Sequence, residues 1–202
     1  MTRGISWDQS LVQHKVILGQ MADSLDPLEV DRVLDAMRAC KGVMFFTGVG
    51  QNQLLAAAVA SRFRAWSFRA IGMSPIAFLQ GNPGVLRTED LLVFISKSGE
   101  TSQLLACIQH PDVRSTTTLA VHATRGSTLE RYSDLSLHLS IAAEADHMGM
   151  APTASTICFL SVLQSIGAQV WSERYDPRAS LTRRSSARKS VQEPQKLIRE
   201  KR

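Results

Sequence analysis

The clearest indication of the fold class is the stretch LLVFISKSGET, which runs from Leu91 to Thr101. It opens with the continuous apolar run that is typical of a strand buried on both faces of a parallel sheet. Hydroxyls, a glycine and the start of a predicted helix follow at once. Ligands of parallel α/β sheets bind beyond the carboxyl ends of the strands. The segment from Ser96 to Thr101 therefore predicts a cradle for a dianionic phosphate, with helix capping by Ser98 as the alternative.

Outward from this stretch, apolar runs and helical patterns alternate along the chain. Predicted strands cover 43–47, 67–71, 90–96, 117–123 and 135–141. Predicted helices cover 7–25, 27–40, 54–66, a segment from Thr101, a short segment after Gly126, and 153–171. Asp26 and Pro27 are a typical N-cap and first-turn pair for the second helix. Alternating units of this kind predict a three-layer α/β sandwich, in which helices cover both faces of a five-stranded parallel sheet.

The composition suits one globular domain with a large core. The chain has 202 residues, 44% of them hydrophobic, which excludes collagen, coiled coil and wholesale disorder. No apolar run approaches the roughly 18 to 20 residues of a membrane-spanning helix, and the first residues lack the apolar stretch of a secretory signal. We therefore expect a cytoplasmic protein without a membrane contact. Cys40, Cys107 and Cys158 lie far apart, which predicts buried thiols with neither a disulfide framework nor a thiolate zinc site. We also expect no metal site and no cofactor.

The positive charge is concentrated at the end of the chain. The formal net charge is +5, yet ten Lys and Arg against three Asp and Glu lie at or beyond Arg174. The rest of the chain is slightly acidic. Residues 182–202 therefore predict a disordered, solvated basic tail, which offers contacts to nucleic acid, an acidic membrane or an acidic partner as alternatives. Because no segment resembles a folded DNA-reading module, we do not expect nucleic-acid binding.

Two glycines follow the first predicted strand, in the turn from Gly48 through Gly50 to Asn52. A dinucleotide-binding fingerprint would need a third glycine where Gln53 stands, and an acid at the end of the second strand, which has none. A nicotinamide cofactor is therefore not expected. The turn predicts either an anion site at the start of the next helix or a tight structural turn.

A third segment follows the last predicted strand, as Glu144-Ala145-x-x-x-Gly149-x-Ala151-Pro152-Thr153-x-Ser155-Thr156. Together with the Gly-x-Gly turn and Ser-x-Ser-Gly-Glu-Thr, in this order, it resembles the sugar isomerase (SIS) domain and, within it, the arabinose-5-phosphate isomerases. The resemblance covers residues 26–181. It implies a flavodoxin-like sandwich that binds phosphosugars, as a homodimer or homotetramer with sites at subunit contacts. Those enzymes interconvert arabinose 5-phosphate and ribulose 5-phosphate.

The resemblance also implies which residues form the site. The catalytic candidates are Glu144 and Glu100, which stand at family acids linked to catalysis. The phosphosugar-binding candidates are Gly48, Gly50, Gln51, Asn52, Gln80, Ser96, Ser98, Gly99, Thr101, His147, Thr153 and Ser155. The implied organisation is N-terminal helices over 1–41, the SIS domain over 42–181 and the basic tail over 182–202. The pair of small repeat domains that often follows in the family is not expected.

The chain departs from the family at charged positions. Gln51 and Gln80 stand where the family has a lysine and a histidine, Asp176 stands at another histidine, and Arg178 replaces a glycine. Isomerisation passes through an enediolate, and losing electrostatic help of this kind costs about 3 to 4 kcal/mol. One hypothesis is an isomerase with altered catalytic groups, in which Lys97 or His147 compensates. The other is a sugar-phosphate sensor that keeps the pocket without turnover.

Overall fold

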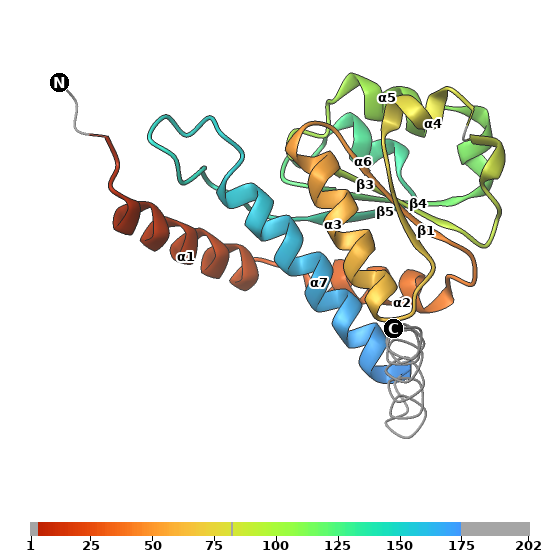
Figure 1. Cartoon of the computed structure of the whole chain (residues 1–202), viewed down its shortest axis with the longest axis horizontal. Coiled ribbons are helices and arrows are strands. Elements are labelled where there is room, and N and C mark those ends of the chain that lie inside the picture. Colours follow the sequence, from red (N-terminus) through yellow and green to blue (C-terminus); the bar gives the residue numbers. More distant parts are fainter. Residues whose placement is uncertain (1–3, 82, 175–202) are drawn as a thin grey trace, which may run out of the picture. The chain divides into compact units, whose positions relative to one another are not determined.

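A five-stranded parallel sheet lies in the first of the two units, residues 1–168 and 169–202, into which the chain divides. The computed structural model describes residues 4–81 and 83–174. The strand order is β2-β1-β3-β4-β5 (Figure 1). The strands are β1 Met44–Gly48, β2 Ala70–Met73, β3 Leu91–Ser96, β4 Thr117–His122 and β5 Leu135–His138. All neighbouring strands are parallel, which confirms the predicted sheet.

Helices cover both faces of this sheet. They are α1 Trp7–Asp23, α2 Pro27–Ala39, α3 Gln51–Ala65, α4 Pro75–Leu79, α5 Ser102–Ile108, α6 Thr128–Tyr132 and α7 Ala154–Arg174, with 3₁₀ turns at Pro83–Val85 and Pro111–Ser115. On one face, the ring of Phe46 lies 5.1 Å from that of Phe63 in α3. Gly167 of α7 packs on the same ring, because a Cβ there would come within 2.5 Å of Phe63.

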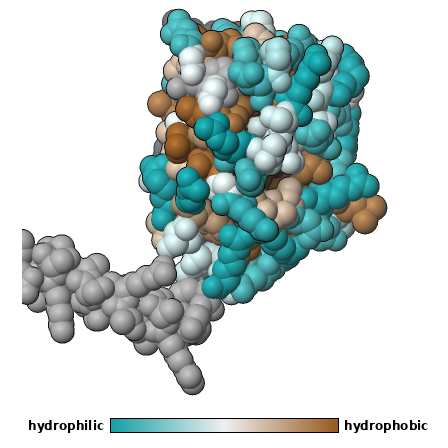
Figure 2. Space-filling view, turned by 90° about the vertical axis from the view of Figure 1, so that its right-hand side faces the viewer, coloured by the Kyte–Doolittle hydropathy of each residue, from teal (hydrophilic) through white to brown (hydrophobic). Residues whose placement is uncertain are grey.

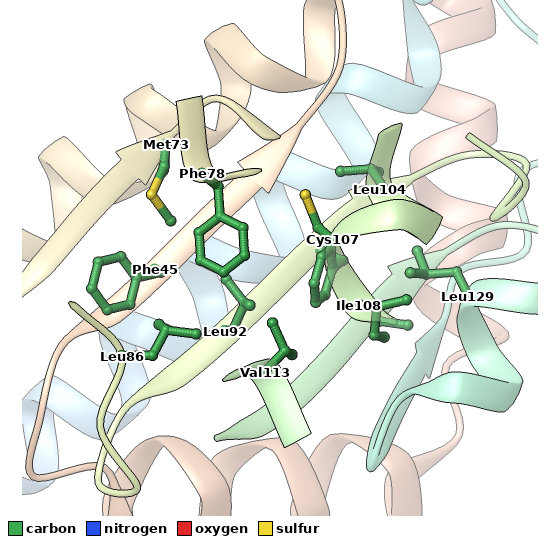
Figure 3. Close-up of a cluster of buried hydrophobic side chains, with 12 residues drawn as sticks. Phe45, Met73, Phe78, Leu86, Leu92, Leu104, Cys107, Ile108, Val113 and Leu129 are labelled. Carbon is green, nitrogen blue, oxygen red and sulfur yellow. The ribbon is translucent and has the colours of Figure 1, made fainter. Parts of the chain in front are cut away.

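The opposite face packs beneath α4, α5 and α6. Figure 3 shows its apolar cluster, in which Phe78 of α4, Leu104 of α5 and Leu129 of α6 surround side chains of the strands. Phe45 and Leu92 come from β1 and β3, and each is at most 4% exposed. Burial on both faces explains why the central strands are continuous apolar runs rather than alternating ones.

The strands end at a common carboxyl edge. Gly48 pairs with Ile95, and Ser96 pairs with His122. After β1 the chain moves to β2 on one side, whereas β3 lies on the other side of β1. The carboxyl ends of β1 and β3 are therefore the topological switch point, where open α/β sheets bind their ligands. The β1–α3 turn and the β3–α5 loop both start there.

Some predicted boundaries are wrong, for identifiable reasons. The second strand does not begin at residue 67, because Ser67 has a φ of 66° and continues the turn that ends α3. The last strand ends at His138 rather than 141, since β4, its neighbour, ends at the paired His122. Helix α3 begins at Gln51 because Gly50 is its N-cap. Helix α4, with Pro75–Leu79, is too short to show an apolar period and was not predicted.

Helix α2 begins as predicted, because the side chain of Asp26 accepts a hydrogen bond of 2.9 Å from the Leu28 N–H. Two of the three cysteines are buried, as predicted. Cys107 and Cys158 are buried, and burial raises their pKa values to about 12 and about 11. Cys40 is half-buried. High thiol pKa values leave little reactive thiolate at neutral pH.

Helix α7 departs from the expectation of no membrane-length apolar segment. Within the described ranges, it is the helix long and apolar enough to cross a membrane, with a mean hydropathy of 1.2 in its best window. Half of that window is buried inside the protein. Phe159 and Leu163 are fully buried, so the apolar character of α7 is accounted for by core packing. On the face shown in Figure 2, hydrophilic residues surround smaller apolar areas.

Candidate functional site

The β3–α5 loop brings two hydroxyls together at the switch point. The Oγ of Ser96 lies 3.0 Å from Oγ1 of Thr101, and the N–H of Gly99 donates to Ser96 Oγ at 3.1 Å. Thr101 is the N-cap of α5, yet its side chain makes no capping bond to that helix. The two hydroxyls converge at the start of α5, where no side chain caps the helix N–H groups. Such an arrangement is suited to bind an anion.

Capping by Ser98, the alternative for this segment, is wrong. The structure places Thr101 at the N-cap of α5 and puts Ser98 three residues earlier. The exposed Ser98 accepts a bond of 3.2 Å from the Glu100 N–H, which is a local turn within the loop. The Ser98 hydroxyl therefore shapes the loop and remains accessible to a ligand.

Contacts with the next loop fix the shape of this cradle. Gly99 has a φ of +67°, and a Cβ there would come within 2.3 Å of Ser127 Oγ, so only glycine fits. The Leu129 N–H donates to the Gly99 carbonyl at 3.0 Å, and the Ala123 N–H donates to the Lys97 carbonyl at 3.0 Å. The cradle is thus formed before any ligand binds, which lowers the entropy cost of binding.

His122, which the sequence did not single out, lies beside the cradle in β4. It is fully buried, with Nε2 at 2.7 Å from Ser136 Oγ and Nδ1 at 2.9 Å from the Thr124 carbonyl. Burial lowers the pKa of His122 despite the nearby Glu130 carboxylate. This neutral imidazole is bonded at both nitrogens, to β5 and to the segment just after β4. Its role is therefore structural support.

Glu100 faces away from the cradle, toward α6. Its carboxylate accepts a bond of 2.7 Å from the Thr128 N–H in the first turn of that helix. Hydrogen bonds from Thr128 and the nearby Arg131 charge lower the pKa of Glu100. The exposed Glu100 therefore acts here as a helix-capping group, and the structure does not bond it to Glu144, the other catalytic candidate.

Glu144 is a buried carboxylate held from two sides. Its side chain is 2% exposed, and Oε1 lies 2.6 Å from Nζ of Lys97 in the cradle loop. Its Oε2 accepts from the N–H groups of Thr153 and Ser155 at 2.9 and 3.0 Å. Burial alone would raise the pKa of Glu144, but these bonds outweigh it and lower the pKa to about 2. The carboxylate is therefore ionised and a weak base.

The segment after Glu144 is a loop built on its own carboxylate. Asp146 accepts from the N–H groups of Met148, Met150 and Ala151. His147 lies exposed within this loop. The N–H groups of Thr153 and Ser155, two of the predicted phosphosugar-binding residues, donate to Glu144 and so fix that side chain.

The β1–α3 turn holds two of the predicted glycines and the amides of Gln51 and Asn52. Gly48 is sterically required, since a Cβ there would lie 2.7 Å from the backbone of Asn52. Gly50 has a φ of +60° and caps α3. Gln51 is exposed at the start of α3, and Gln80 is exposed at the end of α4, so both amides are accessible to a ligand. Asp176 and Arg178 lie outside the described residues.

The family model of the SIS domain matches residues 37–167, which is most of the chain that forms the sheet and this site. The chain belongs to the SIS domain family. The match contains the Gly48 turn, the cradle and Glu144, so the segments that carried the resemblance in the sequence lie in the matched region.

Proteins similar to this SIS domain include arabinose 5-phosphate isomerases and, in fold alone, a domain of a transcription factor. The arabinose 5-phosphate isomerase KpsF of Escherichia coli is 25% identical over 185 residues, covering 87% of this chain and 57% of KpsF. The Escherichia coli protein c3406, solved in complex with arabinose 5-phosphate, superimposes with a TM-score of 0.78 at 22% identity, covering 85% of this chain and 91% of that one. The sugar isomerase domain of the RpiR transcription factor from Sphaerobacter thermophilus gives 0.70 at 18% identity, covering 90% and 97%. The chain spans about half the length of the curated relatives it matches.

One buried polar residue beside the β1–α3 turn was not singled out by the sequence reasoning. Thr47, directly before Gly48, is 2% exposed, and in the described part of the chain its hydroxyl has no hydrogen-bond partner. A single threonine at the end of an apolar strand carries no distinctive pattern, because threonine is common in strands. Only the three-dimensional surroundings of Thr47 distinguish it.

Proposed function

We propose that this SIS domain binds a sugar phosphate, with the phosphate held by the β3–α5 loop. The observation that carries the proposal is the pair of hydroxyls at 3.0 Å, Ser96 Oγ and Thr101 Oγ1, at the uncapped start of α5. Hydroxyl and backbone N–H donors bind a dianion without a metal. The arabinose 5-phosphate bound by c3406, which shares the fold, supports a phosphosugar as the ligand class.

The reaction we propose is aldose–ketose isomerisation of the arabinose 5-phosphate type. It moves a proton between carbon-1 and carbon-2 through an enediolate, which requires a base and stabilisation of the enediolate oxygen. Glu144 is the candidate base. The similarity to KpsF supports this reaction, although Gln51 and Gln80 provide hydrogen bonds without charge.

A non-catalytic sugar-phosphate sensor is the second candidate, and one observation favours it. The pKa of Glu144 is lowered to about 2, with both carboxylate oxygens already bonded. A carboxylate of such low basicity abstracts a carbon-bound proton poorly. The RpiR domain, part of a transcription factor, supports a regulatory use of the same fold.

We also propose that two copies of the chain associate, in the cytoplasm, through the exposed apolar side of α1. Trp7 is 81% exposed and Leu11 62% exposed, one helical turn apart. Ser10 ties α1 to the loop after Glu144, through a bond of 2.6 Å to the Ala145 carbonyl. Contact at α1 would therefore place a second copy beside the site.

The test of phosphosugar binding is a thermal-shift titration with arabinose 5-phosphate. The ligand should raise the melting temperature of the unaltered protein, by mass action on the folded state. Ser96→Ala combined with Ser98→Ala should abolish the shift, because two of the three cradle hydroxyls are lost and that of Thr101 alone remains. Ser115→Ala, an exposed serine on the opposite edge of the sheet, is the matched control and should keep the shift. A full shift in the double variant would place the phosphate elsewhere.

A further inference from the structure

Thr47 has a buried hydroxyl that nothing in the described part of the protein satisfies. The residue is 2% exposed, and its Oγ1 has no hydrogen-bond partner. Other buried threonines do have partners: Thr116 donates to the Arg87 carbonyl, and Thr118 bonds to Asp134 at 2.7 Å. An unsatisfied buried polar group costs stability and requires an explanation.

The side chain of Thr47 points to the same face of the sheet as the cradle. Thr47 pairs with Met73 in β2 and with Phe94 in β3, and both partners belong to the cluster beneath α4 and α5. Side chains of parallel strands alternate between faces with a period of two. Ser96 lies two residues beyond Phe94, so Ser96 and Thr47 share one face.

Thr47 directly precedes Gly48, the last residue of β1, and so lies close to the switch point between β1 and β3. Strand spacing and rise place its Cα about 8 Å from that of Ser96, on the adjacent strand. Two hydroxyls on residues at this separation can both bond one phosphate, directly or with a single bridging water. No apolar role requires the hydroxyl, because a valine has the same shape without the unsatisfied oxygen.

We propose that Thr47 completes the phosphate site, with its hydroxyl bonding the phosphate at the carboxyl ends of β1 and β3. The inference rests on the proposed function and adds a residue from a second strand to the cradle of β3 and α5. It explains the unsatisfied hydroxyl as stability given up for ligand affinity, a trade that is common at functional sites. Thr47 is thereby a phosphate-binding residue.

The experiment compares Thr47→Val and Thr47→Ser with the unaltered chain, by calorimetric titration with arabinose 5-phosphate and with inorganic phosphate. Thr47→Val should weaken both ligands by the same factor, about fivefold to tenfold, because one hydrogen bond to the phosphate is lost. Its melting temperature without ligand should rise by about 2 to 4 °C, since the unsatisfied oxygen is gone. Thr47→Ser should bind both ligands within about twofold of the unaltered protein.

Thr118→Val is the matched control, because Thr118 is similarly buried but bonded to Asp134 at the opposite edge. It should lower the melting temperature and leave both affinities unchanged. Unchanged affinities in Thr47→Val would overturn the inference, whatever its melting temperature. A loss confined to arabinose 5-phosphate would also overturn it, since the contact would then be with the sugar. If neither ligand binds the unaltered protein, the proposed function fails and the inference falls with it.

Discussion

The Lys97–Glu144 pair joins two loops that are 47 positions apart in the sequence. Lys97 belongs to the cradle, whereas Glu144 anchors the start of α7, and their atoms meet at 2.6 Å. The Lys97 side chain is 41% exposed and that of Glu144 is 2% exposed. A carboxylate this deeply buried depends on its partners, and removing one partner leaves a charge poorly compensated. Lys97 therefore stabilises the loop after Glu144 and also places a positive charge in the β3–α5 loop.

The lowered pKa of Glu144 predicts a loss of stability in acid. The pKa falls from an ordinary 4.5 in the unfolded chain to about 2 in the folded protein. Stability from this group is thus fully present above pH 4.5 and is lost as the pH falls toward 2. The difference amounts to about 3 kcal/mol of unfolding free energy. Urea unfolding measured between about pH 7 and about pH 2.5 should show a steep decline in the unaltered chain and a shallower one in Glu144→Gln.

Asp35→Asn is the control for this acid series. Asp35 is an exposed carboxylate that pairs with Arg38 on the surface of α2. Such pairs contribute little to stability, so this variant should follow the unaltered chain at every pH. Parallel declines in Glu144→Gln and the unaltered protein would show that Glu144 is not the group that titrates.

The secondary structure elements that the sequence predicted best are those with strong local signals. The strand at Leu91–Ser96 is a long apolar run, and the helix at Pro27–Ala39 has a capping aspartate and a proline in its first turn. The strand, loop and helix that carry the proposed cradle were predictable for the same reason, because hydroxyls and Gly99 are adjacent in the sequence. Helix α4 has five residues, and so short a helix shows no periodicity.

Contacts between distant segments were beyond the sequence. Glu144 was predicted as a candidate base, but the pairing with Lys97 and the bonds from Thr153 lower its pKa only once the fold joins them. Glu100 looked equivalent to Glu144 in the sequence, and its bond to α6 distinguishes the two. Thr47 was missed because its significance is the lack of a partner among the described residues, a property of three-dimensional surroundings alone.

Helix α1 provides a test of self-association. Its exposed apolar residues, Trp7 and Leu11, would be covered in a complex of two copies, as burial of large apolar side chains stabilises association. Trp7→Ser combined with Leu11→Ser should reduce the molar mass measured by light scattering to that of one chain, with unchanged circular dichroism. Lys15→Ser, an exposed polar position in the same helix, should keep the mass of the unaltered protein. A monomeric unaltered protein would refute the association.

For the molecule as a whole, binding and turnover make different demands on the site. The phosphate cradle lies on one rigid loop, and the amides at Gln51 and Gln80 are on other segments that approach the same edge. Under the proposed function, phosphate affinity depends mainly on the cradle. Turnover also needs positive charge where the enediolate develops, and neutral amides supply much less of it. The SIS fold of this chain is therefore compatible with a sensor and with an isomerase of low activity.

Restoring the family's charged groups distinguishes these two functions. Gln51→Lys and Gln80→His return the family's lysine and histidine, and Asp176→His returns the histidine that the family has at that position. If lost charge limits catalysis, the triple variant should convert arabinose 5-phosphate to ribulose 5-phosphate about a hundredfold faster than the unaltered chain, in a colorimetric ketose assay. Adding Glu144→Gln to the triple variant should remove this gain in rate, because the candidate base is then lost.

The two contradicting outcomes have different meanings. Robust turnover in the unaltered chain that persists in Glu144→Gln would exclude Glu144 as the base and move the search to His147 or to Lys97, whose Nζ would then be released. An absence of turnover in both the unaltered chain and the triple variant, with arabinose 5-phosphate still raising the melting temperature, would leave the sensor as the function. The thermal shift must accompany each rate measurement, because it separates a pocket that binds without reacting from one that has lost its ligand.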